Sequence, residues 1–397
     1  MKQNVRIVFD ALASAMARMA GGKASRIVLI LFLLAGIVPL AKGQSKIPAM
    51  QPEYSAAPWM VHPTGGNDTW INCDMLEYNY RDDQSQQSFS GKLKAIVYGR
   101  HCWTQYGVPT ESYVWVDDGI NQISIPVTTS PDSAATCADM VLAEVVNGSS
   151  VKYYVCVVYD YSPFFWSLIN PSIPANPEFT PYFEVFELTG VGAGTLGYTT
   201  PSILPGTSST LNPLKLSPNN DCGRGVHIDM FTDMSNPNPY SGLPSTHYYG
   251  ITWADGLSTS NELYYTHGDL DPVTSLGTTF QVGTGIHNVY MSDIAALTER
   301  KRGGSVEKEL VIVYPQYPSL YTLEINLSTS SSTTQLLEDS VFVFAPRIEA
   351  MSQYDATASP IPIKWQVNAI IGWNRQYYGS TSGIPYPVPQ VPPCGHP

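Results

Sequence analysis

Charged residues are scarce in this sequence: Asp, Glu, Lys and Arg make up only 14% of its 397 residues. The local motifs of several common enzyme classes are also missing, since the chain has no GxSxG elbow, HExxH motif, P-loop or EF-hand loop. Their absence weakens the serine hydrolase, zinc protease and nucleotide-binding interpretations, although carboxylate chemistry leaves no local signature. No convincing helical period of apolar residues follows residue 43, so a parallel βαβ architecture is not expected.

A membrane-spanning run is not evident either, because the apolar stretch Ile27–Leu40 has only 14 residues. Basic residues precede this stretch, and Ala41-Lys42-Gly43 follows it with small residues where a signal peptidase needs them. We therefore predict that residues 1–43 are a signal peptide cleaved before Gln44, with an uncleaved anchor as the alternative. Removing six Lys or Arg and one Asp with this segment changes the net charge from −12 to −17. The expected protein is secreted or at the cell surface, has no membrane span after cleavage and does not bind nucleic acid.

The six cysteines lack the CxxC or Cys/His spacing of zinc sites. An even number of cysteines in an exported chain is typical of disulfides that staple strands together. Six cysteines allow 15 pairings, and spacing along the chain favours Cys73–Cys102, Cys137–Cys156 and Cys222–Cys394.

Aromatic and turn-forming residues are abundant, with 25 Tyr, 31 Gly and 32 Pro, a composition typical of short strands joined by many turns. An internal repeat occurs five times, and each copy starts with an acid followed by Met, Ile or Ala. These repeated acids are Asp74, Asp139, Asp229, Asp293 and Glu349. Each precedes an apolar run that ends in an aromatic residue: Tyr98, Tyr159, Trp253, Tyr314 and Trp373. The spacing from acid to aromatic is 24, 20, 24, 21 and 24 residues, so odd and even copies differ.

A third strand and a weaker fourth strand follow the aromatic strand in most copies, which predicts an all-β fold of four-stranded antiparallel blades. The blades are expected at about 69–130, 135–218, 224–285, 288–340 and 344–378, inside a domain that spans 44–378. The last copy runs into a Pro-rich tail, 379–397, that cannot form a full ladder. A strand at 57–64, around Val61, is therefore predicted to complete the fifth blade.

In this repeat geometry the chain resembles secreted β-propeller proteins over Trp59 to Tyr378, although no diagnostic family motif is present. The resemblance implies a five-bladed β-propeller closed by an N-terminal strand, and it implies no catalytic residues. Paired β-sandwich domains made from two halves of the repeat array are the alternative architecture.

The five repeated acids are the first candidate site, because equivalent positions on the innermost strands would place them in a ring near the axis. Such a ring could hold calcium or supply the acid, base and modulator of a glycoside hydrolase. The alternative is that each carboxylate accepts hydrogen bonds from backbone N–H groups of a turn or an adjacent blade. Recurrence in every copy favours this structural role. A second, local cluster with metal-ligand character consists of His267, Asp269 and Asp271.

Aromatic residues near the loops could stack on a sugar ring. The candidates are Trp103, Tyr106, Trp166, Tyr240 and Tyr248. We therefore predict a secreted, non-catalytic propeller that binds a glycan or an extracellular protein through its loops, with no required cofactor and with calcium as a possible ligand. Two alternatives remain: a glycoside hydrolase that uses the axial carboxylates, and a structural component of a cell-surface or extracellular assembly.

Overall fold

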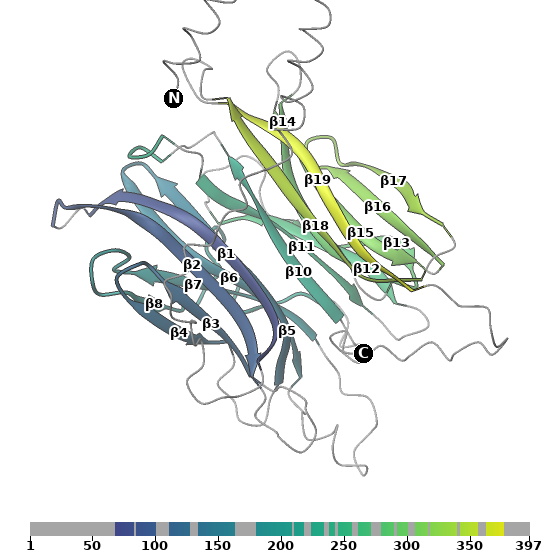
Figure 1. Ribbon diagram of the computed structural model, residues 1–397, viewed down its shortest axis with the longest axis horizontal. Helices are drawn as coiled ribbons and strands as arrows, with labels where there is room; N and C mark the ends of the chain where they lie inside the picture. The colour runs from purple at the N-terminus through teal and green to yellow at the C-terminus, as the bar shows by residue number, and fades with distance from the viewer. Residues whose placement is uncertain are drawn as a thin grey trace, which may run out of the picture. The chain divides into compact units, whose positions relative to one another are not determined.

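The computed structural model describes residues 68–82, 85–100, 111–127, 134–162, 180–208, 210–217, 224–233, 238–242, 245–255, 261–270, 279–289, 292–300, 306–316, 318–339, 342–355 and 363–376. The chain divides into two units, Met1–Pro63 and Thr64–Pro397, and all of these residues belong to the second unit. Their regular elements are all β-strands, so this part of the chain contains no helix that could cross a membrane (Figure 1). The expected signal peptide, the strand around Val61 and the C-terminal tail lie outside the described residues.

Each copy of the repeat forms its own set of antiparallel strands, which we call sheets 1 to 5. Sheet 1 contains β1 (Asp68–Arg81), β2 (Ser88–Arg100), β3 (Glu111–Asp117) and β4 (Gln122–Pro126). Sheet 2 contains β5 (Ala134–Asn147), β6 (Ser150–Ser162), β7 (Thr180–Thr189), β8 (Gly197–Thr199) and β9 (Leu214–Lys215). Sheet 3 contains β10 (Arg224–Asp233), β11 (Ser245–Asp255), β12 (Glu262–Asp269) and β13 (Thr279–His287). Strands β5 to β13 form one nine-stranded sheet, within which sheets 2 and 3 are joined by a single pair, Thr246 of β11 with Glu144 of β5.

The last two copies follow the same pattern. Sheet 4 contains β14 (Asp293–Arg300), β15 (Val306–Gln316), β16 (Ser319–Asn326) and β17 (Ser331–Glu338). Sheet 5 contains β18 (Phe342–Asp355) and β19 (Ile363–Gln376). In every sheet the repeated acid lies on the first strand and the repeated aromatic on the second. The prediction of an all-β fold with antiparallel four-stranded sheets is confirmed for sheets 1, 3 and 4, whereas sheet 2 has a short fifth strand and the described part of sheet 5 has two strands.

Consecutive sheets pack face to face, and a separate hydrophobic core fills each interface. The core between sheets 1 and 2 includes Leu93, Val97, Val155 and Phe186. The core between sheets 2 and 3 includes Val158, Phe183, Ile251 and Trp253. The core between sheets 3 and 4 includes Phe231, Tyr248, Ile312 and Tyr314, and the one between sheets 4 and 5 includes Val311, Val313 and Ile348. The first strands β1, β5, β10, β14 and β18 contact one another in this same order.

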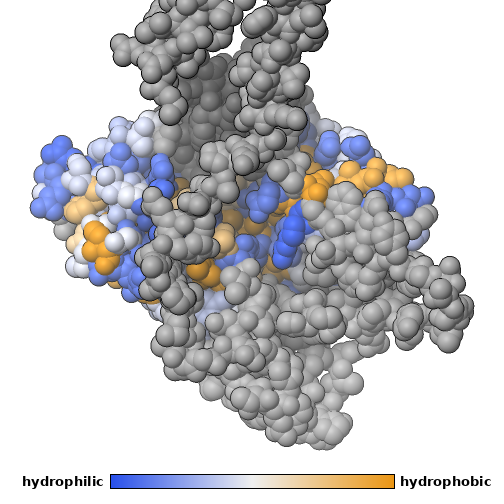
Figure 2. Space-filling model, viewed as in Figure 1, coloured by the Kyte–Doolittle hydropathy of each residue, from blue (hydrophilic) through white to orange (hydrophobic). Residues whose placement is uncertain are grey.

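This stacking explains two kinds of apolar pattern in the sequence. In β6, Val155, Cys156, Val157 and Val158 are all fully buried, because sheet 2 is covered on both faces by its neighbours. In β2, fully buried residues such as Ala95 alternate with half-buried ones. Large exposed hydrophobic side chains are scattered over several sheets, and hydrophilic and hydrophobic residues are interspersed on the face shown in Figure 2.

The cysteines do not form the bridges that their spacing suggested, as far as the described residues show. Cys73 is an exposed free thiol and Cys156 a buried one. In the β5–β6 pairing Cys156 lies opposite Val141, whereas Cys137 falls in the irregularity between Thr136 and Asp139. Four positions along a strand are about 13 Å, whereas disulfide-bonded Cα atoms lie within about 7 Å, so a Cys137–Cys156 bridge does not fit this register. Cys102, Cys222 and Cys394 lie outside the described residues.

Candidate functional site

Four of the five repeated acids connect their own sheet to the next one through backbone amides. In each, Oδ1 accepts a hydrogen bond from the N–H of the following residue, at 2.7–3.0 Å. Oδ2 accepts a second hydrogen bond from a backbone N–H on the first strand of the next sheet. These second bonds join Asp74 to Leu142, Asp139 to Ile228, Asp229 to Ala296 and Asp293 to Ile348, at 2.7, 3.2, 2.7 and 2.9 Å. We call these paired contacts the carboxylate latches.

In the latches the acids have a structural role, because both oxygens of each carboxylate accept hydrogen bonds from backbone N–H groups. A hydrogen bond to a charged acceptor contributes about 1.5–3 kcal/mol. Burial nevertheless raises the pKa of Asp74 and of Asp229, although the amide hydrogen bonds lower it in part. Glu349, on the first strand of sheet 5, keeps a large part of its surface exposed. Its partial burial, together with the charges of Asp293, Asp139 and Asp74, raises its pKa.

The strand register shows that the five acids do not occupy equivalent positions, which corrects the expected single ring. Asp139 and Asp293 lie opposite Val158 and Val313, each one residue before the repeated aromatic. In the first, third and fifth copies, the residue that precedes the repeated aromatic pairs instead with the residue two positions before the repeated acid. The equivalent residues on the five first strands are therefore Asn72, Asp139, His227, Asp293 and Arg347. Asp74, Asp229 and Glu349 lie two residues further along their strands.

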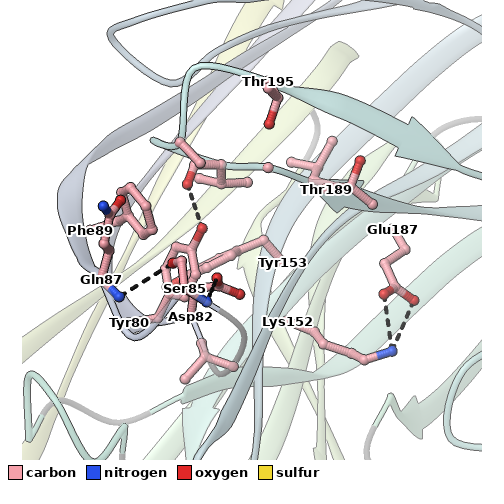
Figure 3. Close-up of a pocket in the computed structure, with 15 residues that line it drawn as sticks. Tyr80, Asp82, Ser85, Gln87, Phe89, Lys152, Tyr153, Glu187, Thr189 and Thr195 are labelled. Carbon is pink, nitrogen blue, oxygen red and sulfur yellow. Dashed lines mark hydrogen bonds and ion pairs between the residues drawn. The ribbon is translucent and has the colours of Figure 1, made fainter.

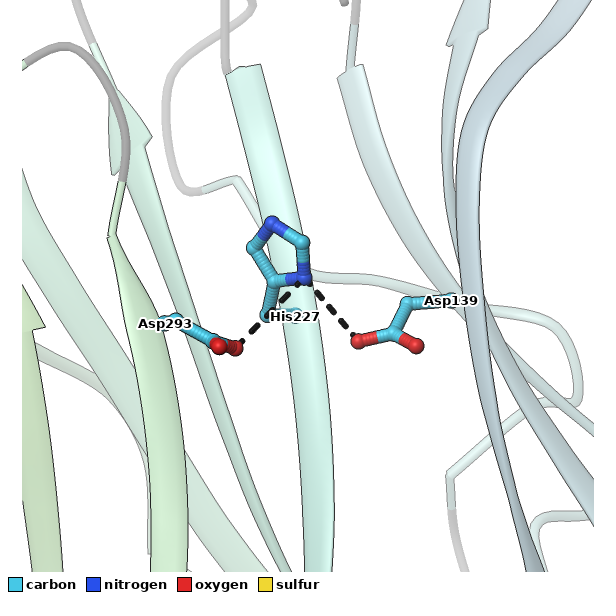
Figure 4. A group of neighbouring side chains, drawn as sticks. All are labelled: Asp139, His227 and Asp293. Carbon is cyan, nitrogen blue, oxygen red and sulfur yellow. Dashed lines mark hydrogen bonds and ion pairs between the residues drawn. The ribbon is translucent and has the colours of Figure 1, made fainter. Parts of the chain in front are cut away.

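These five equivalent residues meet in a group that we call the polar centre. Asn72 donates its side-chain N–H to Asp139 Oδ1. His227 Nδ1 lies 3.0 Å from Asp139 Oδ2 and 3.7 Å from Asp293 Oδ1, so the ring stands between the two carboxylates (Figure 4). Arg347 Nη1 lies 2.8 Å from His227 Nδ1 and 3.7 Å from Asp293 Oδ1. One residue from each of the five sheets thus contributes to a single polar network.

The strand pairing is irregular next to most residues of the polar centre. An irregularity in the strand pairing lies directly before Asn72, Asp139, His227 and Arg347. Asp293 is the first residue of its strand. A β-bulge re-aims the side chain that follows it, so the bulges provide a local reason for the convergence of these side chains.

Burial gives the polar centre unusual electrostatics. Asp139, His227 and Asp293 are 4%, 7% and 7% exposed, whereas the side chain of Arg347 is 58% exposed. Burial acts to raise the pKa of Asp139, but its contacts with His227 and Asn72 and the charge of Arg347 outweigh it, so the pKa lies below its usual value. For Asp293 burial prevails over the same positive charges and raises the pKa. Within the described part of the chain, Asp139, His227 and Asp293 form the one group of three potential metal ligands, with ligand atoms within 4.8 Å of one another.

A groove of about 790 Å³ lies between the β1–β2 hairpin and sheet 2, and we call it the hairpin groove (Figure 3). Its lining includes the aromatic rings of Tyr80 and Phe89, whose centroids are 5.4 Å apart. Tyr80 OH donates to the carbonyl oxygen of Val191 at 2.7 Å and so fixes one side of the groove to the other. On the opposite wall Lys152 and Glu187 form an ion pair of 3.0 Å. Further polar lining comes from Asp82, Ser85, Gln87, Thr189 and Thr195.

The aromatic residues that were expected to bind a ligand do not form an exposed site among the described residues. Tyr248 is fully buried in the core between sheets 3 and 4 and stacks on Phe231, so it is not an exposed binding residue. Tyr240 is half-buried, and its OH donates to the carbonyl oxygen of Ser149 at 3.1 Å. Trp103, Tyr106 and Trp166 lie outside the described residues. The aromatic residues that line the groove, Tyr80 and Phe89, were not among the candidates.

The contacts of His267 and Asp269 also differ from those expected of a metal-binding cluster. His267 Nδ1 lies 2.6 Å from Tyr248 OH, and burial lowers the pKa of His267 to about 4, which keeps the imidazole neutral. Asp269 Oδ1 lies 3.6 Å from His247 Nε2. Asp271 belongs to a segment that the structure does not describe. The described members of this cluster therefore face other side chains of sheet 3.

Comparison with protein-family models and with curated proteins finds no match for this chain. The candidate sites are therefore defined by their geometry alone.

Proposed function

We propose that the protein is an exported, non-catalytic β-propeller that binds a neutral glycan in the hairpin groove. The single observation that carries the non-catalytic part of the proposal is the set of carboxylate latches. Both oxygens of these four acids accept backbone donors, and Asp139 and Asp293 are buried, so the acids do not form the open carboxylate pair that glycoside hydrolysis requires.

The arrangement of the sheets supports the propeller. Each sheet packs on the next through a separate core, and the first strands follow one another in chain order, as blades do around an axis. The polar centre receives one side chain from each first strand, as an axial position would. In this proposal the strand around Val61 completes the fifth blade, and the sheets close into a ring.

The hairpin groove supports a glycan as the ligand. Sugar rings stack their C–H faces on aromatic side chains and exchange hydrogen bonds with amides, carboxylates and hydroxyls. Phe89 and Tyr80 provide rings in the groove, and Gln87 and Thr189 provide polar groups. The acidic chain disfavours an anionic ligand, so we expect a neutral sugar.

The test is a glycan array probed with the purified chain from Gln44, with and without calcium, followed by titration calorimetry on the sugars that bind. Phe89→Ala and Gln87→Ala should each weaken binding about tenfold or more, as expected for loss of a stacking or hydrogen-bonding contact. Tyr198→Ala is the matched control, because Tyr198 is an exposed aromatic on β8 that does not line the groove. It should bind like the unmodified chain.

Three results would contradict the proposal. Equal affinity of Phe89→Ala and Tyr198→Ala would remove the groove as the binding site. Absence of binding to any glycan would favour the extracellular assembly alternative. Hydrolysis of aryl glycosides by the purified chain would favour the hydrolase.

A further inference from the structure

We propose that the polar centre is a binding site for a divalent transition-metal ion, with Asp139 Oδ2, His227 Nδ1 and Asp293 Oδ1 as its protein ligands. The inference does not depend on the glycan or on the hairpin groove. It rests on the geometry and the charge of residues from three neighbouring first strands.

The first argument is the position of His227 Nδ1 between two carboxylates. Nδ1 lies 3.0 Å from Asp139 Oδ2 and 3.7 Å from Asp293 Oδ1. Arg347 Nη1 lies 2.8 Å from Nδ1 and 3.2 Å from Nε2, so the guanidinium lies over the face of the ring and does not occupy the in-plane position at Nδ1. A metal ion at this point would accept lone pairs from the imidazole and from both carboxylates.

The second argument is the charge balance of a buried group. The carboxyl groups of Asp139 and Asp293 are both buried, and the guanidinium of Arg347 lies beside them at the edge of the group. Buried charges are costly unless they are compensated. A divalent ion would neutralise both carboxylates, and Arg347, whose side chain is 58% exposed, can swing into solvent to make room.

The spacing of the ligand atoms suits a small ion. Two ligands bound to Zn²⁺ with tetrahedral geometry at about 2.1 Å are about 3.4 Å apart. The observed separations of 3.0 Å and 3.7 Å from His227 Nδ1 lie on either side of this value. Second-sphere partners are present as well, because Asn72 donates to Asp139, and the amides of Ile228 and Ile348 donate to the two carboxylates.

The donor set also indicates the class of metal. Calcium and magnesium prefer sites built from oxygen ligands only. Imidazole ligands suit zinc, copper, iron and nickel, and Asp or Glu oxygens also bind zinc at about 2.0–2.2 Å. We therefore expect Zn²⁺ to bind more tightly than Ca²⁺ or Mg²⁺.

The experiment is calorimetric titration of the chelator-treated chain with ZnCl₂, and in parallel with CaCl₂ and MgCl₂. The unmodified chain should bind one Zn²⁺ ion. His227→Ala should weaken the affinity for Zn²⁺ by at least about tenfold, because a ligand is lost. Arg347→Ala should strengthen it by about tenfold or more, because a positive charge beside the ion is removed. A purely structural salt-bridge network would not give this second result.

Asp229→Asn is the matched control, because Asp229 forms a carboxylate latch on the same strand as His227 but lies outside the polar centre. It should keep the Zn²⁺ affinity of the unmodified chain. Co²⁺ absorption in the visible range provides a second readout, expected in the unmodified chain and in Arg347→Ala and absent from His227→Ala. The proposal is overturned if Arg347→Ala binds Zn²⁺ no better than the unmodified chain, if His227→Ala binds it equally well, or if Ca²⁺ binds more tightly than Zn²⁺.

Discussion

A buried carboxyl group joins three sheets and makes the stability of the fold depend on pH. Glu144 of β5 is 4% exposed and accepts a hydrogen bond of 2.9 Å from the side chain of Asn238. Asn238 also donates to the carbonyl oxygen of Asn79 on β1, and the N–H of Asn79 donates to Tyr153 OH. Burial raises the pKa of Glu144 from 4.5 to about 7, although hydrogen bonds from Asn238 and Tyr153 lower it in part.

The sign of the effect follows from the higher pKa in the folded state. Below pH 4.5 Glu144 is protonated in both the folded and the unfolded chain, so its contribution to the free energy of unfolding is fully present. Between pH 4.5 and 7 the unfolded chain releases the proton while the folded chain keeps it, and the folded state loses stability. Each pKa unit corresponds to about 1.4 kcal/mol, so the loss from this group is about 3 kcal/mol by pH 7.

Urea unfolding followed by Trp fluorescence between pH 4.5 and 7.5 measures this loss. In Glu144→Gln the titrating group is absent, so the variant should gain about 3 kcal/mol relative to the unmodified chain over this range. Glu324→Gln, at an exposed position of β16, should follow the unmodified chain. A Glu144→Gln curve parallel to that of the unmodified chain across the whole range would refute the reasoning.

The latches and the proposed closure give three further expectations. Asp229→Ala leaves the amides of Met230 and Ala296 without their acceptor and should lower the free energy of unfolding by at least about 2 kcal/mol, as measured by urea unfolding. Glu349→Ala, at an exposed acid of the same repeat, should change it by less than about 0.5 kcal/mol, and equal costs for the two variants would contradict the distinction between them. Deleting residues 44–64 should lower the melting temperature of the whole domain by more than about 5 °C, and an unchanged melting temperature would count against closure by the N-terminal strand.

The sheets could be predicted from the sequence because acid and aromatic residues mark the first two strands of every copy. The distance between them along the chain depends on the hairpin that joins those strands. In sheet 2 only Gly148 and Ser149 separate the paired ends of β5 and β6, and Gly148 adopts φ 63° in this tight turn. In sheet 1 the connection runs from Asp82 to Gln87. Such differences leave the repeat visible, since they alter its length by only a few residues.

The polar centre could not be predicted in the same way, because its members become equivalent only through the cross-strand register. Asn72 stands 26 residues before its aromatic, whereas Asp139 stands 20 residues before its own. No fixed spacing aligns the two positions. The available signal was that Asn72, His227 and Arg347 each precede a repeated acid by two residues, with chemistry that differs from copy to copy. The hairpin groove could not be predicted from aromatic residues in loops, because Tyr80 and Phe89 belong to strands β1 and β2.

The latch also explains why odd and even copies differ. Each acid accepts a hydrogen bond from the amide of the next residue on its own strand. It accepts a second one from the first strand of the next sheet, from the amide one residue beyond the position equivalent to its own. Two neighbouring acids at the same level would therefore compete for one N–H. Asp74 and Asp229 avoid this competition because the positions level with them on β5 and β14 are Val141 and Ala295.

Alternation of this kind cannot continue around a closed ring with an odd number of copies. In the proposed five-bladed ring, Glu349 and Asp74 would be neighbours at the same level. The amide that Glu349 would need is that of Met75, which already donates to Asp74 at 2.7 Å. In the proposed ring, the junction between the last and the first copies would therefore have no latch of this kind. It would depend on other contacts, such as those of the N-terminal strand that is proposed to complete the fifth blade.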